Sequence, residues 1–233
     1  MWKKQPKRVI FTLCINDYAP RIRKLTWPLI KRYAKKIDAK FVVISERRFP
    51  KWPVTYEKLQ IHTLAQEMGL DWAIYIDSDV LIHPNSPDWT CHIAKDHVAH
   101  NTADFANNRW RYDQYFMRDG RNLGSCNWFA AASDWCLDLW HPLDDLTLEE
   151  AVQQIFPTQN EKNSRLIEPE HLIDDFTVSR NIAKYGLKFT ALADLCKNWG
   201  YAQGNPWFWH QYGISEDQKA FEMQKVLKIW GLV

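Results

Sequence analysis

Several features are missing from this sequence, and their absence narrows the class of protein. There is no run of about 18 consecutive apolar residues, so no transmembrane helix is predicted. Residues 1–8 are basic but lack the apolar run and cleavage site of a signal peptide, so we expect a cytoplasmic protein. No internal repeat and no low-complexity segment is present.

The cysteines do not form a metal-binding or disulfide framework. The five cysteines are irregularly spaced, and none belongs to a CxxC pair. We therefore expect reduced thiols in or near the core and no zinc site. Charge of one sign is not in excess either, because 30 basic and 28 acidic residues leave a formal net charge of +2. A balance this close to neutral does not by itself indicate a nucleic-acid binder.

What is present is the composition of a folded chain. Apolar residues make up 46% and charged residues 25%, which excludes a mostly disordered chain, a collagen and a disulfide miniprotein. The length of 233 residues predicts one domain spanning residues 1–233. Tryptophan is abundant, at 13 residues. Its ring stacks on sugars and bases but also fills cores, so the count alone does not distinguish these roles.

The first third alternates between buried strands and amphipathic helices. Apolar runs predict strands at residues 9–15, 41–44 and 73–76. Helices are predicted between them, over residues 27–37 and 57–68, because apolar residues recur there at helical intervals. This order predicts an α/β fold with a mostly parallel central sheet and flanking helices, in which ligands bind beyond the carboxyl ends of the strands. The first strand is not followed by GxGxxG, which argues against a dinucleotide site.

The remaining sequence is less regular. Residues 84–121 are polar, aromatic and irregular, which is typical of active-site loops. Further elements are then predicted in chain order: a strand at 127–132, a short helix near 149–155, a helix at 172–185, a strand at 187–192 and an amphipathic helix at 216–230.

The third predicted strand ends in two carboxylates. Asp77, Ser78 and Asp79 follow the apolar run directly. Side chains at i and i+2 of an extended chain project to the same side, and unpaired charges at the end of a buried strand are costly. A divalent cation cancels this charge and keeps coordination positions free for phosphate oxygens and water. A solvated turn with two aspartates is the alternative.

This arrangement resembles the GT-A glycosyltransferases, which carry a DxD motif after the strand that closes the nucleotide-binding half. The resemblance implies a metal-dependent glycosyltransferase in which Asp77 and Asp79 bind Mn²⁺ or Mg²⁺. The ion would hold the diphosphate of a nucleotide sugar, expected to be a UDP-sugar. The resemblance also implies that the domain has two halves. Residues 1–82 would bind the nucleotide, and residues 83–233 would bind the acceptor and the sugar. Besides the DxD segment with Ser78, the donor-binding positions implied are Cys14, Ile15, Asn16, Asp17, Tyr56 and Lys58.

Three later segments resemble the same family. Gly124 and Asn127 belong to a segment similar to the N-x-G stretch that lines the sugar pocket. Asp174 and Asp175, at a helix start, are similar to the acidic motif beside the donor sugar and are the catalytic candidates. His210 is similar to the late histidine that supplies a third metal ligand, a pattern closer to retaining families. Each segment also has an ordinary structural explanation. The first could be a simple turn, the acidic pair could complement the helix dipole, and the histidine could be packed among other side chains.

A haloacid dehalogenase phosphatase fits part of the same pattern. Asp77 would then be the nucleophile and Asp79 a general acid, with Ser133 and the later aspartates imitating further motifs. In that family, however, the DxD segment ends the first strand of the core, whereas two β–α units precede it here. The glycosyltransferase is therefore the preferred interpretation.

A non-enzymatic carbohydrate or nucleic-acid binder is the third possibility. The cluster at residues 109–112, two arginines interleaved with Trp and Tyr, could stack sugars or bases. A binding module needs no buried carboxylate pair, so we assign this cluster to the acceptor side of a transferase. The acceptor itself is open between a glycan, a protein, a small molecule and DNA. DNA would require one basic surface from Lys3, Lys4, Lys7, Arg8, Arg47, Arg48 and Lys51.

Overall fold

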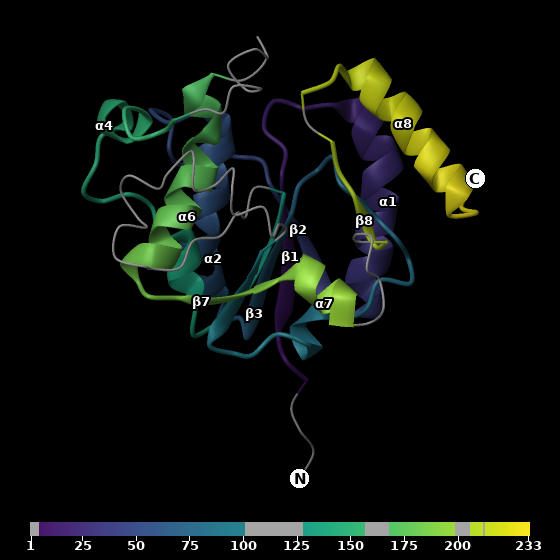
Figure 1. The fold of residues 1–233 in the computed structure, drawn as a ribbon, viewed down its shortest axis with the longest axis horizontal. Helices are drawn as coiled ribbons and strands as arrows, with labels where there is room; N and C mark the ends of the chain where they lie inside the picture. Colours follow the sequence, from purple (N-terminus) through teal and green to yellow (C-terminus); the bar gives the residue numbers. More distant parts are fainter. Residues whose placement is uncertain (1–4, 101–127, 157–167, 199–205, 212) are drawn as a thin grey trace.

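The computed structural model describes residues 5–100, 128–156, 168–198, 206–211 and 213–233. Within these ranges, six strands form a central sheet in the order β2-β1-β3-β6-β5-β7 (Figure 1). The strands are β1 (Arg8–Leu13), β2 (Ala39–Ile44), β3 (Trp72–Ile76), β5 (His97–His100), β6 (Phe129–Ser133) and β7 (Lys188–Ala191). Two short strands, β4 (Leu81–Ile82) and β8 (Phe208–Trp209), form a separate pair.

Helices cover both faces of this sheet (Figure 1). The α-helices are α1 (Pro20–Lys36), α2 (Ile61–Met68), α4 (Leu148–Val152), α6 (Ile173–Lys184), α7 (Leu192–Asn198) and α8 (Glu216–Ile229). Short 3₁₀ helices are η1 (Val54–Gln60), η2 (Trp89–Cys91), η3 (Leu137–Trp140) and η4 (Pro169–Leu172).

The parallel core predicted from the sequence is confirmed. β1 pairs in parallel with both β2 and β3, and β5 pairs in parallel with β7. β6 is the exception, because it runs antiparallel to β3 and β5. The carboxyl ends of β1 and β3 therefore share one edge of the sheet with the start of β6, where Phe129 pairs with Ile76.

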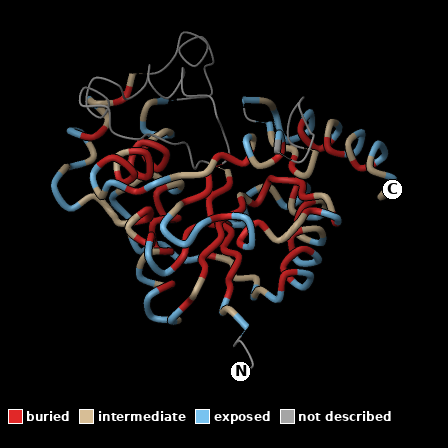
Figure 2. The backbone as a smooth tube through the Cα atoms, turned by 60° about the horizontal axis from the view of Figure 1, so that its bottom comes forward, coloured by how far each residue is buried: buried red, intermediate tan, exposed pale blue. Residues whose placement is uncertain are grey.

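Alternate side chains of the buried strands enter two hydrophobic clusters, as the period of two in a strand requires. Phe11 and Tyr75 pack in the cluster that includes residues of α2 and α6. Ile10 and Ile74 pack in the cluster that includes residues of α1 and α7. Figure 2 shows the result, a buried central sheet surrounded by helices and loops whose outer positions are exposed.

α8 packs on α1 and lies on the outer side of α1, away from the central sheet (Figure 1). Met223 and Leu227 of α8 form a cluster with Ile22 of α1 and with Leu81 of β4. β8 runs antiparallel to β4, with Trp209 opposite Leu81. This pairing brings the residues that follow β8 next to those that follow β3. None of the described helices is both long enough and apolar enough to cross a membrane.

Three predicted elements are corrected by the structure. The helix predicted from residue 27 begins earlier, at Pro20. A proline is tolerated there because the backbone N–H of the first turn has no partner within the helix. The helix also contains Pro28. The supposedly irregular segment 84–121 contains η2 and β5, a four-residue strand whose two histidines hide its pattern. The start of the helix predicted over residues 57–68 is the 3₁₀ helix η1.

Some predictions fall on residues that the structure does not describe. Gly124, Asn127 and the cluster at residues 109–112 lie outside the described ranges. The four described cysteines, which exclude Cys126, are free thiols.

Candidate functional site

A cavity of about 570 Å³ opens at the sheet edge where β1 and β3 end. Residues from several elements line it: Leu13, Ile15, Asn16 and Tyr18 after β1, Val54, Thr55 and Lys58 of η1, Tyr75 and Asp77 to Asp79 at β3, His171, Leu172, Asp174 and Asp175 around the start of α6, and His210, Gly213, Ile214 and Lys219 near α8. The cavity therefore has the position that ligands take in α/β sheets.

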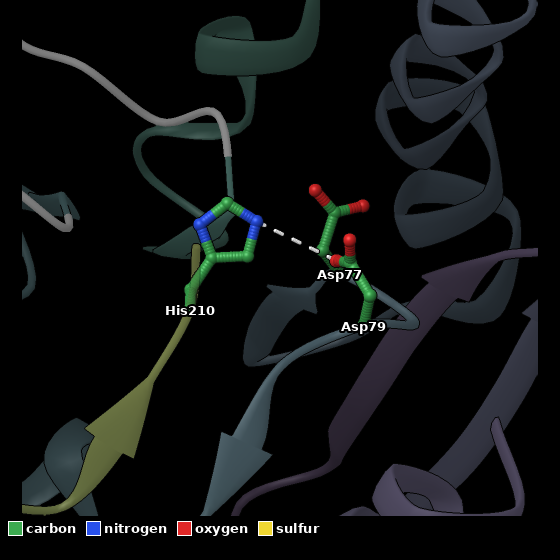
Figure 3. A group of neighbouring side chains, drawn as sticks. All are labelled: Asp77, Asp79 and His210. Atoms are coloured by element: carbon green, nitrogen blue, oxygen red, sulfur yellow. Dashed lines mark ion pairs between the residues drawn. The ribbon is translucent and has the colours of Figure 1, made fainter. Parts of the chain in front are cut away.

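Two carboxylates and one imidazole from this lining lie close together (Figure 3). Asp77 and Asp79 follow β3, and His210 follows β8. One ligand atom from each of these residues lies within 4.8 Å of the others. His210 Nε2 is 3.5 Å from Asp79 Oδ1. Two carboxylate oxygens and an imidazole nitrogen form a donor set that suits a divalent metal ion.

The turn that carries the two aspartates is held from both sides. The Thr26 hydroxyl of α1 donates a hydrogen bond to the Ser78 carbonyl at 2.6 Å. The Asp77 amide donates to the Trp128 carbonyl at 3.0 Å. The Trp128 ring also stacks on the His210 imidazole, with a centroid distance of 5.8 Å. These contacts fix the three candidate ligands before any ion binds.

Asp79 is the more strongly paired of the two carboxylates. Its Oδ2 accepts a hydrogen bond from the Lys219 ammonium of α8 at 2.5 Å, while Oδ1 faces His210. Burial raises the pKa of Asp79, but the contacts with His210 and Lys219 outweigh it and hold this pKa well below its usual value. Asp79 is therefore ionised at neutral pH.

Asp77 accepts a hydrogen bond from the Tyr75 hydroxyl, and within the described residues no cation lies within ion-pair distance of it. Burial raises its pKa above the usual value although the Lys58 charge acts in the opposite direction, and the negative charge of Asp79 raises it further. A cation bound between Asp77, Asp79 and His210 would remove this cost. The donor atoms and this buried carboxylate together fit a divalent ion.

A second buried ion pair lines the cavity at the start of α6. The Lys58 ammonium pairs with the Asp174 carboxylate, and the two side chains are 3% and 5% exposed. The ammonium also lies 4.7 Å from the centroid of the Tyr75 ring. Burial lowers the pKa of Lys58, but Asp174 and Asp77 outweigh this and raise it above its usual value. The lysine is therefore a fixed positive charge beside Asp77.

The loop after β1 forms the mouth of the cavity. Asn16, Asp17 and Ala19 have φ values of 53°, 54° and 46°, which non-glycine residues rarely adopt. The Arg23 side chain stabilises this loop by pairing with the Asp17 carboxylate and donating to the Tyr18 carbonyl at 2.7 Å. Tyr18 is 55% exposed and lines the cavity. Partial burial, with Asp79 and Asp77 nearby, raises the pKa of its hydroxyl to about 12.

Most of the residues singled out in the sequence come together in this cavity. Ile15, Asn16, Lys58, Asp77, Ser78, Asp79, Asp174, Asp175 and His210 all line it. Cys14, Asp17 and Tyr56 do not belong to the lining. Cys14 is buried, Asp17 pairs with Arg23, and the Tyr56 hydroxyl accepts a hydrogen bond from the Leu143 amide at 2.8 Å.

Sequence reasoning missed several lining residues of the site, among them Tyr18 and Lys219. Tyr18 directly follows the Asn16–Asp17 pair, so the exposed loop after β1 was a signal for it. Lys219 gave no signal, because a lysine in an amphipathic helix is normally exposed. Here it is 8% exposed.

The fold is that of the GT-A glycosyltransferases. Two solved structures share it across almost the whole chain, although no protein-family model and no curated protein matches the sequence. One is a glycosyltransferase involved in the glycosylation of the major capsid of PBCV-1, with a TM-score of 0.52, 13% identity, and coverage of 95% of this chain and 100% of the other. The second is the galactosyltransferase LgtC in complex with donor and acceptor sugar analogs, with a TM-score of 0.54, 12% identity and 95% of each chain covered. At such identities the likeness concerns the fold.

Proposed function

We propose that this protein is a metal-dependent glycosyltransferase that transfers a sugar from a nucleotide-diphosphate donor, a UDP-sugar, to an acceptor hydroxyl. The observation that carries the proposal is the meeting of Asp77, Asp79 and His210 in a cavity at the carboxyl edge of the sheet. In this fold class that edge is where ligands bind.

Asp77, Asp79 and His210 would hold the ion, Mn²⁺ or Mg²⁺, and the nitrogen ligand favours Mn²⁺. When bound, such an ion supplies a positive charge that stabilises the departing diphosphate. Three protein ligands would leave the other coordination positions of the ion for phosphate oxygens and water.

The loop after β1 supports a nucleoside at the mouth of the cavity. Tyr18 presents a half-exposed aromatic ring next to the Asn16 side chain. An exposed ring of this kind is a stacking surface for a base, and base–aromatic stacking is worth about 1–3 kcal/mol. The contacts of Arg23 with Asp17 and Tyr18 hold the loop in this conformation. We therefore place the uracil of the donor here.

Retention of configuration at the anomeric carbon is part of the proposal, because three of the four described aspartates in the lining have other roles. An inverting enzyme needs a carboxylate base for the acceptor hydroxyl. Asp77 and Asp79 belong to the ion site, and the Asp174 carboxylate pairs with Lys58. The remaining described aspartate in the lining, Asp175, is only 2% exposed. Proton NMR of the first product formed from an α-linked donor tests this, because a β-linked product would mean inversion and make Asp175 the base.

The phosphatase alternative is not favoured by the geometry. It would need a serine next to the Asp77 carboxylate. Ser133 instead pairs with Trp72 at the far end of β3, and its hydroxyl donates to the Lys95 carbonyl at 2.5 Å. The serine and the aspartates therefore lie at opposite ends of the strand.

A DNA acceptor also receives no support from the described residues. Two of the seven basic residues that would form its surface are committed elsewhere. Arg8 is 9% exposed and pairs with Asp88, and Arg47 pairs with Glu57. The acceptor is therefore defined here only as a hydroxyl compound.

Calorimetric titration of the protein with UDP, GDP and CDP, each with and without Mn²⁺, tests the proposed function. We expect UDP to bind most tightly and to need the ion. The Asp77→Asn variant should lose the Mn²⁺-dependent binding, whereas Asp96→Asn, an exposed control paired with Lys188, should keep it. Binding of none of the three nucleotides in the presence of Mn²⁺ or Mg²⁺ would overturn the proposal.

A further inference from the structure

Lys219 already occupies the carboxylate that a divalent ion would need. Its ammonium donates to Asp79 Oδ2 at 2.5 Å, and the lysine is 8% exposed. Asp79 Oδ1 lies 3.5 Å from His210 Nε2. Both oxygens of Asp79 thus have partners within the protein, and the stronger partner is a cation.

The position of this ammonium depends on the docking of α8. Lys219 lies in the first turns of the helix, between the N-cap Ser215 and the buried residues Ala220 and Met223. Those buried residues pack against Ile22 of α1 and Leu81 of β4. The Lys219–Asp79 pair therefore ties the start of α8 to the turn that follows β3.

A divalent ion and an ammonium compete for one carboxylate. At distances of about 4 Å, a double and a single positive charge repel by several kcal/mol in a partly buried setting. The Asp79 carboxylate cannot keep a short, charge-assisted hydrogen bond to Lys219 and also neutralise the ion fully. Ion binding must therefore weaken or break the contact with Lys219.

We infer that Lys219 is an internal counter-ion for Asp79 that a divalent cation displaces, so that ion binding is coupled to release of the first turns of α8. This inference rests on the proposed ion site at Asp77, Asp79 and His210. Lys219 holds the Asp79 carboxylate in place while no ion is bound. It also sets the ion's apparent affinity, because each binding event first breaks the Lys219–Asp79 contact.

The first experiment measures Mn²⁺ affinity in the absence of nucleotide, from the electron paramagnetic resonance signal of the free ion. Lys219→Met removes the competing charge and keeps the length of the side chain. We expect it to bind Mn²⁺ about tenfold more tightly than the native protein, which is the effect of losing one charge-assisted hydrogen bond. Lys219→Arg should stay within about threefold of the native affinity, because the competing charge is retained.

Lys225→Met is the matched control. It makes the same chemical change on the same helix, but Lys225 is exposed and pairs with Glu222. Its Mn²⁺ affinity should equal that of the native protein. An equal gain in Lys219→Met and Lys225→Met would mean a general charge effect and would overturn the inference.

The second experiment follows α8 itself by amide hydrogen exchange. Mn²⁺ should speed the exchange of residues 218–222 in the native protein, because their anchor to Asp79 is lost. In Lys219→Met the exchange should already be fast and should not respond to the ion. No change in the native protein would overturn the coupling even if the affinities behaved as expected.

The outcomes separate this inference from the proposed function. If neither the native protein nor Lys219→Met binds Mn²⁺ or Mg²⁺, the ion site itself is wrong. If both bind Mn²⁺ with the same affinity, the ion site stands and the role assigned to Lys219 fails. Circular dichroism of each variant confirms that the comparison is made between folded proteins.

Discussion

Two buried lysine–aspartate pairs line the same cavity, Lys58 with Asp174 and Lys219 with Asp79. They have the same chemistry and similar burial, but different neighbours. Asp174 has no part in the Asp77–Asp79–His210 group, whereas Asp79 belongs to it. The first pair connects η1 with α6, and its carboxylate is not one of the candidate ion ligands. The second connects α8 to the turn after β3 through a carboxylate that an ion would also use. The role of a buried ion pair thus depends on what else needs its carboxylate.

The largest expected effect comes from breaking the first pair. Lys58→Met leaves the Asp174 charge buried and uncompensated, which should lower the free energy of unfolding by about 3–5 kcal/mol. Urea denaturation measures this loss. The double variant Lys58→Met with Asp174→Leu should recover most of it, because no unpaired charge remains. A single variant as stable as the native protein would show that the pair does not connect η1 and α6 energetically.

The next effect distinguishes the two aspartates by ion binding. Asp79→Asn should weaken Mn²⁺ binding by at least about 100-fold, because it removes a charged oxygen ligand. Asp174→Asn removes the same charge from the same cavity and should change the Mn²⁺ affinity by less than about threefold. Isothermal titration with Mn²⁺ alone provides both numbers. Equal losses would mean that the ion responds to the total charge of the cavity rather than to its ligands.

His100, a buried ionisable residue that belongs to neither pair, should make the stability of the protein depend on pH. Burial lowers the pKa of His100 to about 4, although Asp194 acts in the opposite direction. The unfolded chain therefore takes up a proton below about pH 6.5 that the folded protein refuses, and stability falls as the pH falls. Between pH 6.5 and 5 this effect should lower the free energy of unfolding of the native protein by about 2 kcal/mol.

Thermal unfolding of His100→Leu tests this. The variant should lose less stability than the native protein over that pH range, whereas the exposed control His92→Gln should behave like the native protein. An unchanged pH profile in His100→Leu would mean that folding does not lower the pKa of His100.

The smallest effect concerns the support of the turn between the ion ligands. Thr26→Val keeps the shape of the side chain but removes its hydrogen bond to the Ser78 carbonyl, which should cost about 1 kcal/mol of stability and weaken Mn²⁺ binding severalfold. Thr177→Val removes a hydroxyl that donates to the Ile173 carbonyl within α6, and it should leave ion binding unchanged. Identical Mn²⁺ affinities in the two variants would show that α1 does not support the site.

The first half of the sheet could be predicted because its signals are local. β1, β2 and β3 are apolar runs separated by amphipathic segments, and Asp77 and Asp79 follow the third run directly. β5 was missed because it has four residues, two of them histidines. The reversed direction of β6 could not be read either, since nothing in Phe129–Ser133 distinguishes a parallel from an antiparallel neighbour.

The site was predictable where its chemistry is explicit and not where it depends on packing. Paired aspartates and a late histidine are rare enough to stand out in a sequence. Tyr56 was assigned to the donor side by resemblance, but its ring stacks on Trp52 at 4.1 Å and its hydroxyl binds the Leu143 amide. Lys219 faces Asp79 because α8 docks on α1, which is a property of the tertiary structure.

The pairing of β4 with β8 has a consequence for the order in which the molecule folds. Asp79 and Lys219 are separated by 140 residues, whereas β1, β2 and β3 lie close together in the chain. Contacts between distant segments form late, because the intervening chain must first lose its conformational freedom. We therefore expect the carboxyl end of β3 to form early with both aspartates still hydrated. The histidine and the lysine would then arrive together in a slow final step, when β8 pairs with β4.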